Sequence, residues 1–283
     1  MMFTLPQPSG GFRWVQLPPG PALVCEALEP FAGHFFTARA WRLGERTADS
    51  TDGWLEVART IQIDVAQVGR LSQVHGAEVV TYKKGGRGPG DGIPRADVVL
   101  TDDPDVAITV QTADCLPILV VDRRSSAVAA AHAGWRGLAA GVPHVVVDRM
   151  VSDFGSSRDD LVVAVGPAIG GCCYEVGADV RERFEQEKFS PAALSRWFHP
   201  GPLAMSANPP MRSLSAERHA GHWFFDGWTC AREQLETAGV SSDQIFGVDL
   251  CTASHESSFC SYRRDGAVAG RMAAVIRPRP SRR

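Results

Sequence analysis

The chain has 283 residues, of which 44% are apolar and 22% are charged, and its formal net charge is −3. This composition supports a packed core and excludes an intrinsically disordered chain, and the small net charge gives no sign of a nucleic-acid or membrane-surface partner. No apolar run approaches the roughly 18 residues that span a bilayer. The first residues lack the basic and apolar stretches of a secretory signal. We therefore expect a cytoplasmic protein with neither nucleic acid nor membrane as partner.

The N-terminal quarter has the weakest patterning. The elements it predicts are, in order, a strand over 34–43, a helix over 52–67, two short strands within 71–82 and a surface loop over 83–95. The helix rests on apolar residues that recur at helical spacing from Leu55 to Val65. The loop rests on its high content of glycine and proline.

Repeated apolar runs of four to eight residues follow between 97 and 131, and their β-branched content predicts strands buried on both faces. A helix is expected over 135–155, and Pro143 places its true start near residue 140. The remaining expected elements are a strand over 161–170, helices over 178–188 and 227–239, a strand over 244–250 and a final apolar stretch over 268–276. This alternation predicts a mixed α/β or α+β architecture.

The seven cysteines are scattered, odd in number and without a CxxC pair. This pattern argues against a disulfide framework, a zinc ribbon and thioredoxin-like chemistry. Most of these thiols are expected to be small core residues. Packing is also expected for Cys172 and Cys173, because adjacent cysteines chelate one ion poorly.

Three segments place a reactive side chain beside glycine or proline at an expected strand end, where catalytic groups are often found. They are QVHG (73–76), QTADCLP (111–117) and AHAGWRG (131–137). They also carry Gln73, Asp114 and Arg136, which are costly to bury without partners or a task.

If the three segments converge, two imidazoles and a thiolate suit zinc or copper with one coordination position left open. The same groups also suit metal-free catalysis, with Cys115 as nucleophile and His132 or His75 as its base. The sequence spacing does not choose between the two.

Together with two later segments, these motifs resemble the laccase-domain (YfiH-like) family. The matching segments run in order from about residue 70 to residue 276: QVHG, TADCLP, AHAGWRG, VGPAIG with CCYEVG, and SYRRDG with GRMAA. Members have been described as polyphenol oxidases and, in bacteria, as purine nucleoside phosphorylases. The resemblance implies a single α+β domain over 1–283, built from sandwiched mixed sheets flanked by helices, with a basic disordered tail at 278–283.

The resemblance also implies an active site in which His75, Cys115 and His132 bind Zn²⁺, with copper as the alternative ion. The implied activities are phosphorolysis of adenosine, inosine and methylthioadenosine, together with deamination of adenosine. The partners are then purine nucleosides and phosphate.

Four further residues are expected to contact substrate. A guanidinium offers a planar fork of donors, so Arg136 is the expected phosphate anchor. Asp114, beside Cys115, is the expected proton shuttle. Gln73 and Arg264 complete the set, and Arg264 shares its assignment with Arg263.

The chain departs from the family pattern at two places, and the first of them concerns a segment that can affect substrate specificity. The stretch over 34–54 replaces a glycine- and asparagine-rich segment, and Gly171 stands where the family has proline.

Three alternatives stay open. The first is a thiol hydrolase in which Cys115 and His132 cleave an amide, for instance in a cell-wall precursor. The second is a copper-dependent polyphenol oxidase, which is disfavoured because multicopper oxidases need about ten histidine ligands in HxH patterns, and this chain has eight histidines and no HxH. The third is a purine-binding module without turnover.

Overall fold

Two six-stranded sheets form the centre of the fold in the computed structural model, which describes residues 5–44, 50–89, 92–203, 205–211, 219 and 221–279. The first sheet has the order β1 (Phe12–Leu17), β2 (Gly20–Cys25), β3 (Ala32–Thr37), β15 (Met272–Pro278), β7 (Ala107–Thr112), β4 (Val68–Gly69). The second has the order β14 (Ile245–Gly247), β10 (Leu161–Val165), β8 (Leu116–Asp122), β9 (Val128–Ala133), β6 (Val98–Thr101), β5 (Val79–Tyr82). Both sheets mix parallel and antiparallel pairs.

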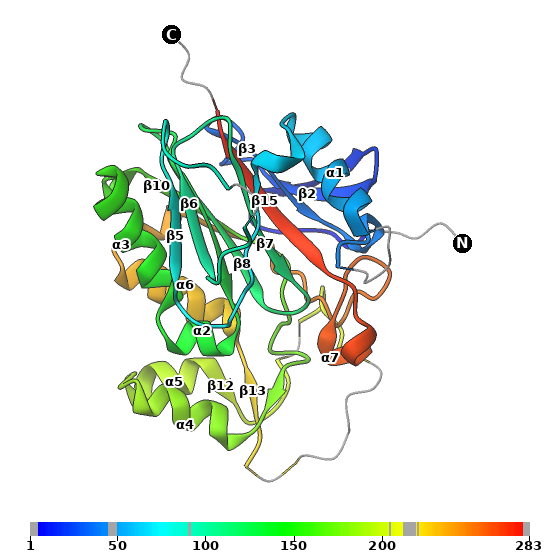
Figure 1. Ribbon diagram of the computed structural model, residues 1–283. Coiled ribbons are helices and arrows are strands. Elements are labelled where there is room, and N and C mark those ends of the chain that lie inside the picture. Colours follow the sequence, from blue (N-terminus) through cyan, green and yellow to red (C-terminus); the bar gives the residue numbers. More distant parts are fainter. Residues whose placement is uncertain are drawn as a thin grey trace.

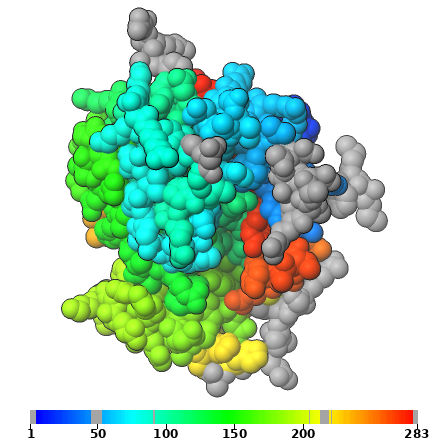
Figure 2. Space-filling model, in the orientation of Figure 1, coloured from blue at the N-terminus to red at the C-terminus, as the bar shows by residue number. Residues whose placement is uncertain are grey.

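Seven α-helices and a small third sheet complete the described residues. The helices are α1 (Ser50–Ile61), α2 (Trp135–Ala139), α3 (Val142–Phe154), α4 (Ala178–Gln186), α5 (Pro191–Trp197), α6 (Gly227–Thr237) and α7 (Tyr262–Asp265). The third sheet has the order β11 (Glu175–Val176), β13 (Trp223–Phe225), β12 (Phe198–His199). Together with α4 and α5 it forms a lobe beside one end of the two sheets, coloured yellow-green at the bottom of Figures 1 and 2.

The layers follow from the alternation of side chains along each strand. In β8, Leu119 and Val121 point into the core between the two sheets, whereas Ile118 and Val120 point into the core under α3 and α6. Both faces of this strand are therefore buried, which explains its continuous apolar run. On the far side, α1 covers the first sheet (Figure 1) with a separate apolar cluster. The expected single α+β domain of sandwiched sheets flanked by helices is confirmed.

Several expected elements are shorter than their patterns suggested. The helix over 52–67 ends at Ile61, because Gln62 adopts a left-handed backbone conformation with φ of 60°. Within 71–82 only β5 forms a strand. The helix over 135–155 is two helices separated at Gly141, and Pro143 lies in the first turn of the second, as its position indicated.

The β1–β2 hairpin had no predicted counterpart. The disordered tail expected at 278–283 begins too early, because Pro278 is still part of β15. Residues 280–283 lie outside the described part. Within the described ranges, no helix is both long and apolar enough to cross a membrane.

Candidate metal centre

The β8–β9 hairpin brings two of the three expected reactive residues together. Cys115 directly precedes β8, and His132 lies in β9 opposite Pro117. His75 joins them from the loop before β5, and the rings of the two histidines meet edge-on with centroids 4.9 Å apart. The candidate ligand atoms of the three side chains all lie within 4.8 Å of one another. The three segments singled out in the sequence thus converge at one end of this hairpin.

A buried carboxylate, Asp97, organises this arrangement. Its oxygens accept the backbone N–H groups of Val74, His75 and Gly76 at 3.2, 3.0 and 2.8 Å. Asp97 Oδ1 also lies 2.8 Å from Nδ1 of His132. Burial alone would raise the pKa of Asp97, but these hydrogen bonds, led by that of His132, lower it below its ordinary value. The ionised carboxylate can only accept, so Nδ1 of His132 donates and Nε2 is left for a ligand.

The backbone is strained where it presents two of these segments. His75 and Asp114 adopt positive φ angles of 60° and 95°, which are unfavourable for residues other than glycine and recur at functional sites. Asp114 is held there because its carboxylate accepts the hydroxyl of Thr252 at 2.5 Å and the backbone N–H of Arg263 at 2.7 Å. The turn at Asp114 positions the adjacent Cys115.

Gly134 lies directly against the trio, at a position where a side chain would not fit. A Cβ atom at this position would lie 2.9 Å from Sγ of Cys115 and 3.3 Å from Cδ2 of His75. Real side chains do not tolerate the first contact, so the close approach of the β9–α2 junction to the thiol requires glycine.

The charges of Cys115 and His132 reinforce each other. Burial opposes ionisation of the thiol, but the charge and hydrogen bond of His132, assisted by His75, lower the pKa of Cys115 to about 6. Burial also opposes the charge of His132, but the thiolate and Asp97 raise the pKa of His132 to about 9. The two shifts favour a thiolate beside an imidazolium. A bound cation would displace the imidazole proton and take the thiolate as a ligand.

Two imidazoles and a thiolate, mutually close and beside open space, fit a zinc or copper ion with three protein ligands. The donor set and the space kept by Gly134 are therefore compatible with a metal held by His75, Cys115 and His132.

A cavity of ≈ 570 Å³ opens beside the trio, a size typical of small-molecule sites. Its walls include the aromatic rings of Trp135, Tyr174 and Tyr262. Three arginines also line it: Arg136, Arg263 and Arg271. None of the three forms an ion pair with another described residue.

Three of the four expected substrate contacts line this cavity. Arg136 stacks on Trp135, with its guanidinium carbon 4.3 Å from the ring centroid. The side-chain amide of Gln73 is occupied by the backbone N–H and carbonyl of Gln111, at 2.7 and 2.8 Å. The carboxylate of Asp114 is occupied by Thr252 and Arg263, as described above.

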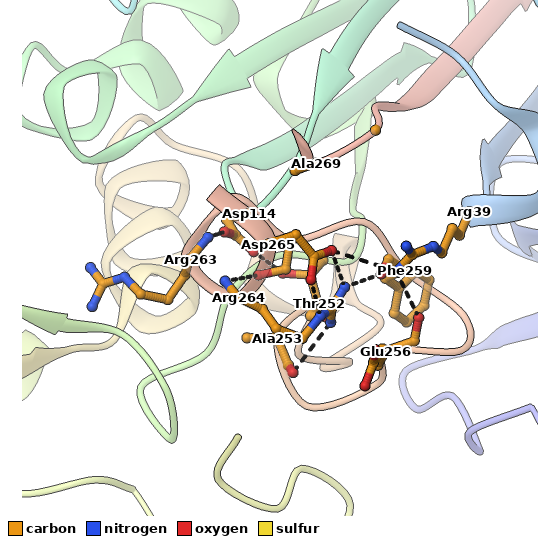
Figure 3. Close-up of polar contacts among 12 residues, drawn as sticks. Arg39, Asp114, Thr252, Ala253, Glu256, Phe259, Arg263, Arg264, Asp265 and Ala269 are labelled. Carbon is orange, nitrogen blue, oxygen red and sulfur yellow. Dashed lines mark hydrogen bonds and ion pairs between the residues drawn. The ribbon is translucent and has the colours of Figure 1, made fainter. Parts of the chain in front are cut away.

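Arg264 does not line the cavity. Its guanidinium donates to the carbonyls of Thr252 and Phe259 and pairs with Asp265 at 2.8 Å (Figure 3). The neighbouring Arg263 points away from this network and lines the cavity instead. Consecutive residues of a helix such as α7 point about 100° apart, and the sequence alone does not show which of the two arginines faces the cavity.

Sequence reasoning also missed Asp97, Tyr174 and Arg271. Tyr174 and Arg271 lie within the resembling segments CCYEVG and GRMAA, so those segments could have indicated them. Asp97 follows an irregular loop in an apolar run, and its role depends on tertiary contacts alone.

Comparison with known proteins gives consistent matches. The model of a family described as multi-copper polyphenol oxidoreductase laccase matches residues 40–279. "Purine nucleoside phosphorylase YfiH" of Escherichia coli is 37% identical over 206 residues, which cover 73% of this chain and 72% of that protein. "Purine nucleoside phosphorylase YlmD" of Geobacillus stearothermophilus is 33% identical over 240 residues, which cover 83% of this chain and 80% of that protein.

The crystal structure of YlmD from Geobacillus stearothermophilus superimposes with a TM-score of 0.77 at 28% identity, covering 96% of this chain and all of that one. The match to the family model extends over most of the chain, and the relatives agree with it in sequence and in fold. The chain therefore belongs to the multi-copper polyphenol oxidoreductase laccase family, the laccase-domain family that its motifs resemble.

Proposed function

We propose that this protein is a purine nucleoside phosphorylase whose active site is the cavity beside His75, Cys115 and His132, with Zn²⁺ as its metal. The names of the relatives from Escherichia coli and Geobacillus stearothermophilus support the reaction class. The convergence of the three side chains at the mouth of a nucleoside-sized cavity supports the location.

The observation that carries the proposal is the set of three cavity arginines without ion-pair partners among the described residues. Phosphorolysis needs a phosphate anion beside the ribose, and guanidinium groups bind phosphate through paired hydrogen bonds. Arg136 is the arginine beside the trio and is already oriented by Trp135. Arg263 donates to the carbonyl of Glu175 at 2.7 Å, which holds its side chain at the cavity wall.

The other groups bind and orient the nucleoside. Tyr262 offers an aromatic face on which a purine can stack, whereas Trp135 and Tyr174 each carry a cavity arginine over one ring face. Asp97 holds the imidazole of His132 in one orientation, and Cys115 contributes its negative charge. When bound, Zn²⁺ supplies a Lewis acid to the reaction. The arginines then fix phosphate against the ribose, so that positioning and preorganised charge provide the rate enhancement.

The proposed substrates are adenosine, inosine and methylthioadenosine, and the products are the free base and the corresponding sugar 1-phosphate. Deamination of adenosine belongs to the same proposal. It is distinguishable because it yields inosine and needs no phosphate.

The test is chromatographic product analysis with adenosine or inosine, in the presence and absence of phosphate. We expect base and ribose 1-phosphate from the unmodified protein only when phosphate is present, and loss of both with Cys115→Ala. Cys230→Ala is the matched control, because Cys230 is a buried thiol outside the cavity. Equal turnover by the Cys115→Ala variant would contradict the proposal.

One specific observation favours a second candidate, the thiol hydrolase. Cys115, His132 and Asp97 have the order of nucleophile, base and orienting carboxylate found in thiol catalysis. This alternative predicts that alkylation of Cys115 and hydrolysis of amides both proceed in the presence of strong chelators. Nucleoside turnover that requires phosphate and is abolished by chelators would exclude it.

A further inference from the structure

Three buried thiols meet at a second place in the fold, outside the cavity of the His75 trio. Cys172 and Cys173 lie in the turn after Ile169–Gly171, and Cys251 follows β14. All three are fully buried, and their sulfur atoms lie within 4.8 Å of one another. Adjacent cysteines alone chelate an ion poorly, but the fold adds a third sulfur from a segment about 80 residues further along the chain.

We propose that Cys172, Cys173 and Cys251 bind a structural Zn²⁺ ion, with the hydroxyl oxygen of Ser254 as the fourth ligand. The spacing of the donor atoms fits one ion. Two sulfur ligands of a tetrahedral zinc, each about 2.3 Å from the metal, are about 3.8 Å apart. The sulfurs of Cys172 and Cys173 are 3.6 Å apart. Oγ of Ser254 lies 3.6 and 3.5 Å from these two sulfurs.

Backbone N–H groups point at two of the three sulfurs. The N–H of Gly170 donates to Sγ of Cys251 at 3.3 Å, and the N–H of Met211 donates to Sγ of Cys173 at 3.2 Å. Hydrogen bonds of this kind stabilise the charged form of a ligand and are typical of the surroundings of metal sites. Thiols that served packing alone would not need donors directed at two of the three sulfurs.

The charge balance selects a divalent ion. The surrounding side chains are apolar, including those of Ile169, Ala253 and Trp228, so a large net charge would be costly. Three thiolates around Zn²⁺ leave a net charge of −1, whereas three thiolates around Cu⁺ would leave −2. Binding releases the three thiol protons to solvent.

The site would connect a segment that lines the active cavity with a segment that supports one of its lining residues. Cys173 directly precedes Tyr174, which lines that cavity. Cys251 directly precedes Thr252, whose hydroxyl holds the carboxylate of Asp114. A closed site with four protein ligands is structural rather than catalytic. We therefore expect this zinc to stabilise the fold whether or not the protein is a phosphorylase.

The test measures zinc in the full-length Cys115→Ala variant, in which the first site is broken. We expect this variant to retain about one zinc per chain, and its X-ray absorption spectrum to show three sulfur neighbours at about 2.3 Å. Because the variant keeps only histidines at the first site, a sulfur shell reports the thiol cluster. Absence of zinc, or a shell of nitrogen and oxygen alone, would overturn the proposal.

A pair of double variants locates the ion. We expect Cys115→Ala/Cys251→Ser to lose the remaining zinc and to unfold at lower temperature than Cys115→Ala. Cys115→Ala/Cys230→Ser is the matched control, because Cys230 is equally buried and lies outside the cluster, and it should retain the zinc. Equal zinc content in both double variants would also overturn the proposal. The absorption spectrum of Cys115→Ala keeps the test decisive if Cys251→Ser fails to fold.

Discussion

At the scale of a single residue, Asp97 connects the two histidines of the candidate centre. One carboxylate binds three consecutive backbone N–H groups of the loop that carries His75, and it also orients His132. The strained φ of His75 is maintained by these hydrogen bonds. Asp97 touches neither the thiol nor the cavity, so its effect on activity must pass through the two histidines.

The substitution Asp97→Asn tests this positioning role. The amide keeps the shape but loses the charge that fixes His132, and we expect metal affinity and kcat to fall by about 10- to 100-fold. Asp122→Asn is the matched control, since Asp122 is a buried carboxylate that caps backbone N–H groups at the other end of β8. Zinc titration and steady-state kinetics at several pH values measure the effect. Equal losses in both variants would indicate a purely structural role.

His34 provides a pH dependence that is independent of the metal. Burial lowers the pKa of His34 from 6.5 to about 4, and its Nε2 accepts the backbone N–H of Cys25 at 2.9 Å. The unfolded chain therefore binds a proton between pH 6.5 and 4 that the folded protein excludes. The free energy of unfolding must fall as the pH falls through this window, by about 2 kcal/mol between pH 7.5 and 5.

Urea unfolding at these two pH values measures this contribution as the difference between the unmodified protein and His34→Gln. The variant should lose less stability on acidification by about 2 kcal/mol. An identical pH dependence in both proteins would show that His34 does not titrate in this way.

At the scale of elements, the junction between β9 and α2 determines access to the thiol. Gly134 is the N-cap residue of α2 and packs against Cys115 and His75. Gly134→Ala must displace one of these side chains, and a shift of this size in an active site can cost about 100-fold in rate.

We therefore expect Gly134→Ala to fold normally but to lose nucleoside turnover and zinc binding. Circular dichroism, zinc analysis and product formation measure the three properties. Gly88→Ala is the control, because its Cβ would approach only the side-chain oxygen of Gln67, at 3.3 Å. Full activity of Gly134→Ala would contradict the close approach described here.

The sequence predicted the central elements better than the N-terminal ones. The strands β6 to β10 are buried on both faces, so their continuous apolar runs are distinctive. The strand β1 lies at the edge of its sheet and only its Phe12 is buried, so its sequence has no continuous apolar run. The first helix ends before Gln62 because this residue adopts a left-handed conformation, which its residue type does not predict.

The candidate site was predictable to the extent that it lies in local motifs. The trio and Arg136 occupy short segments that the family resemblance made specific. Contacts between distant segments decide whether a polar side chain faces the cavity or its own loop, and local sequence does not contain this information. This is why Arg263 and Arg264 could not be distinguished, and why Asp97 and Cys251 were not connected to the sites they contact.

At the scale of the whole molecule, the sandwiched sheets act as a rigid support. The β8–β9 hairpin presents Cys115 and His132, and the segments that pack against its end supply His75, Tyr174 and the arginines. The proposed structural zinc would stabilise the segments that position Tyr174 and Asp114. The two proposed metal sites therefore have separate roles, and only the His75 trio is expected to affect the reaction directly.

Reconstitution of the chelated protein with Zn²⁺, while inosine phosphorolysis is measured, tests the metal-dependent active site directly. We predict that chelation abolishes the formation of hypoxanthine and ribose 1-phosphate, and that added Zn²⁺ restores it in the unmodified protein but not in Cys115→Ala. Phosphorolysis that persists in the chelated protein, or that zinc restores equally in the Cys115→Ala variant, would contradict the assignment of His75, Cys115 and His132 as the metal-binding active site.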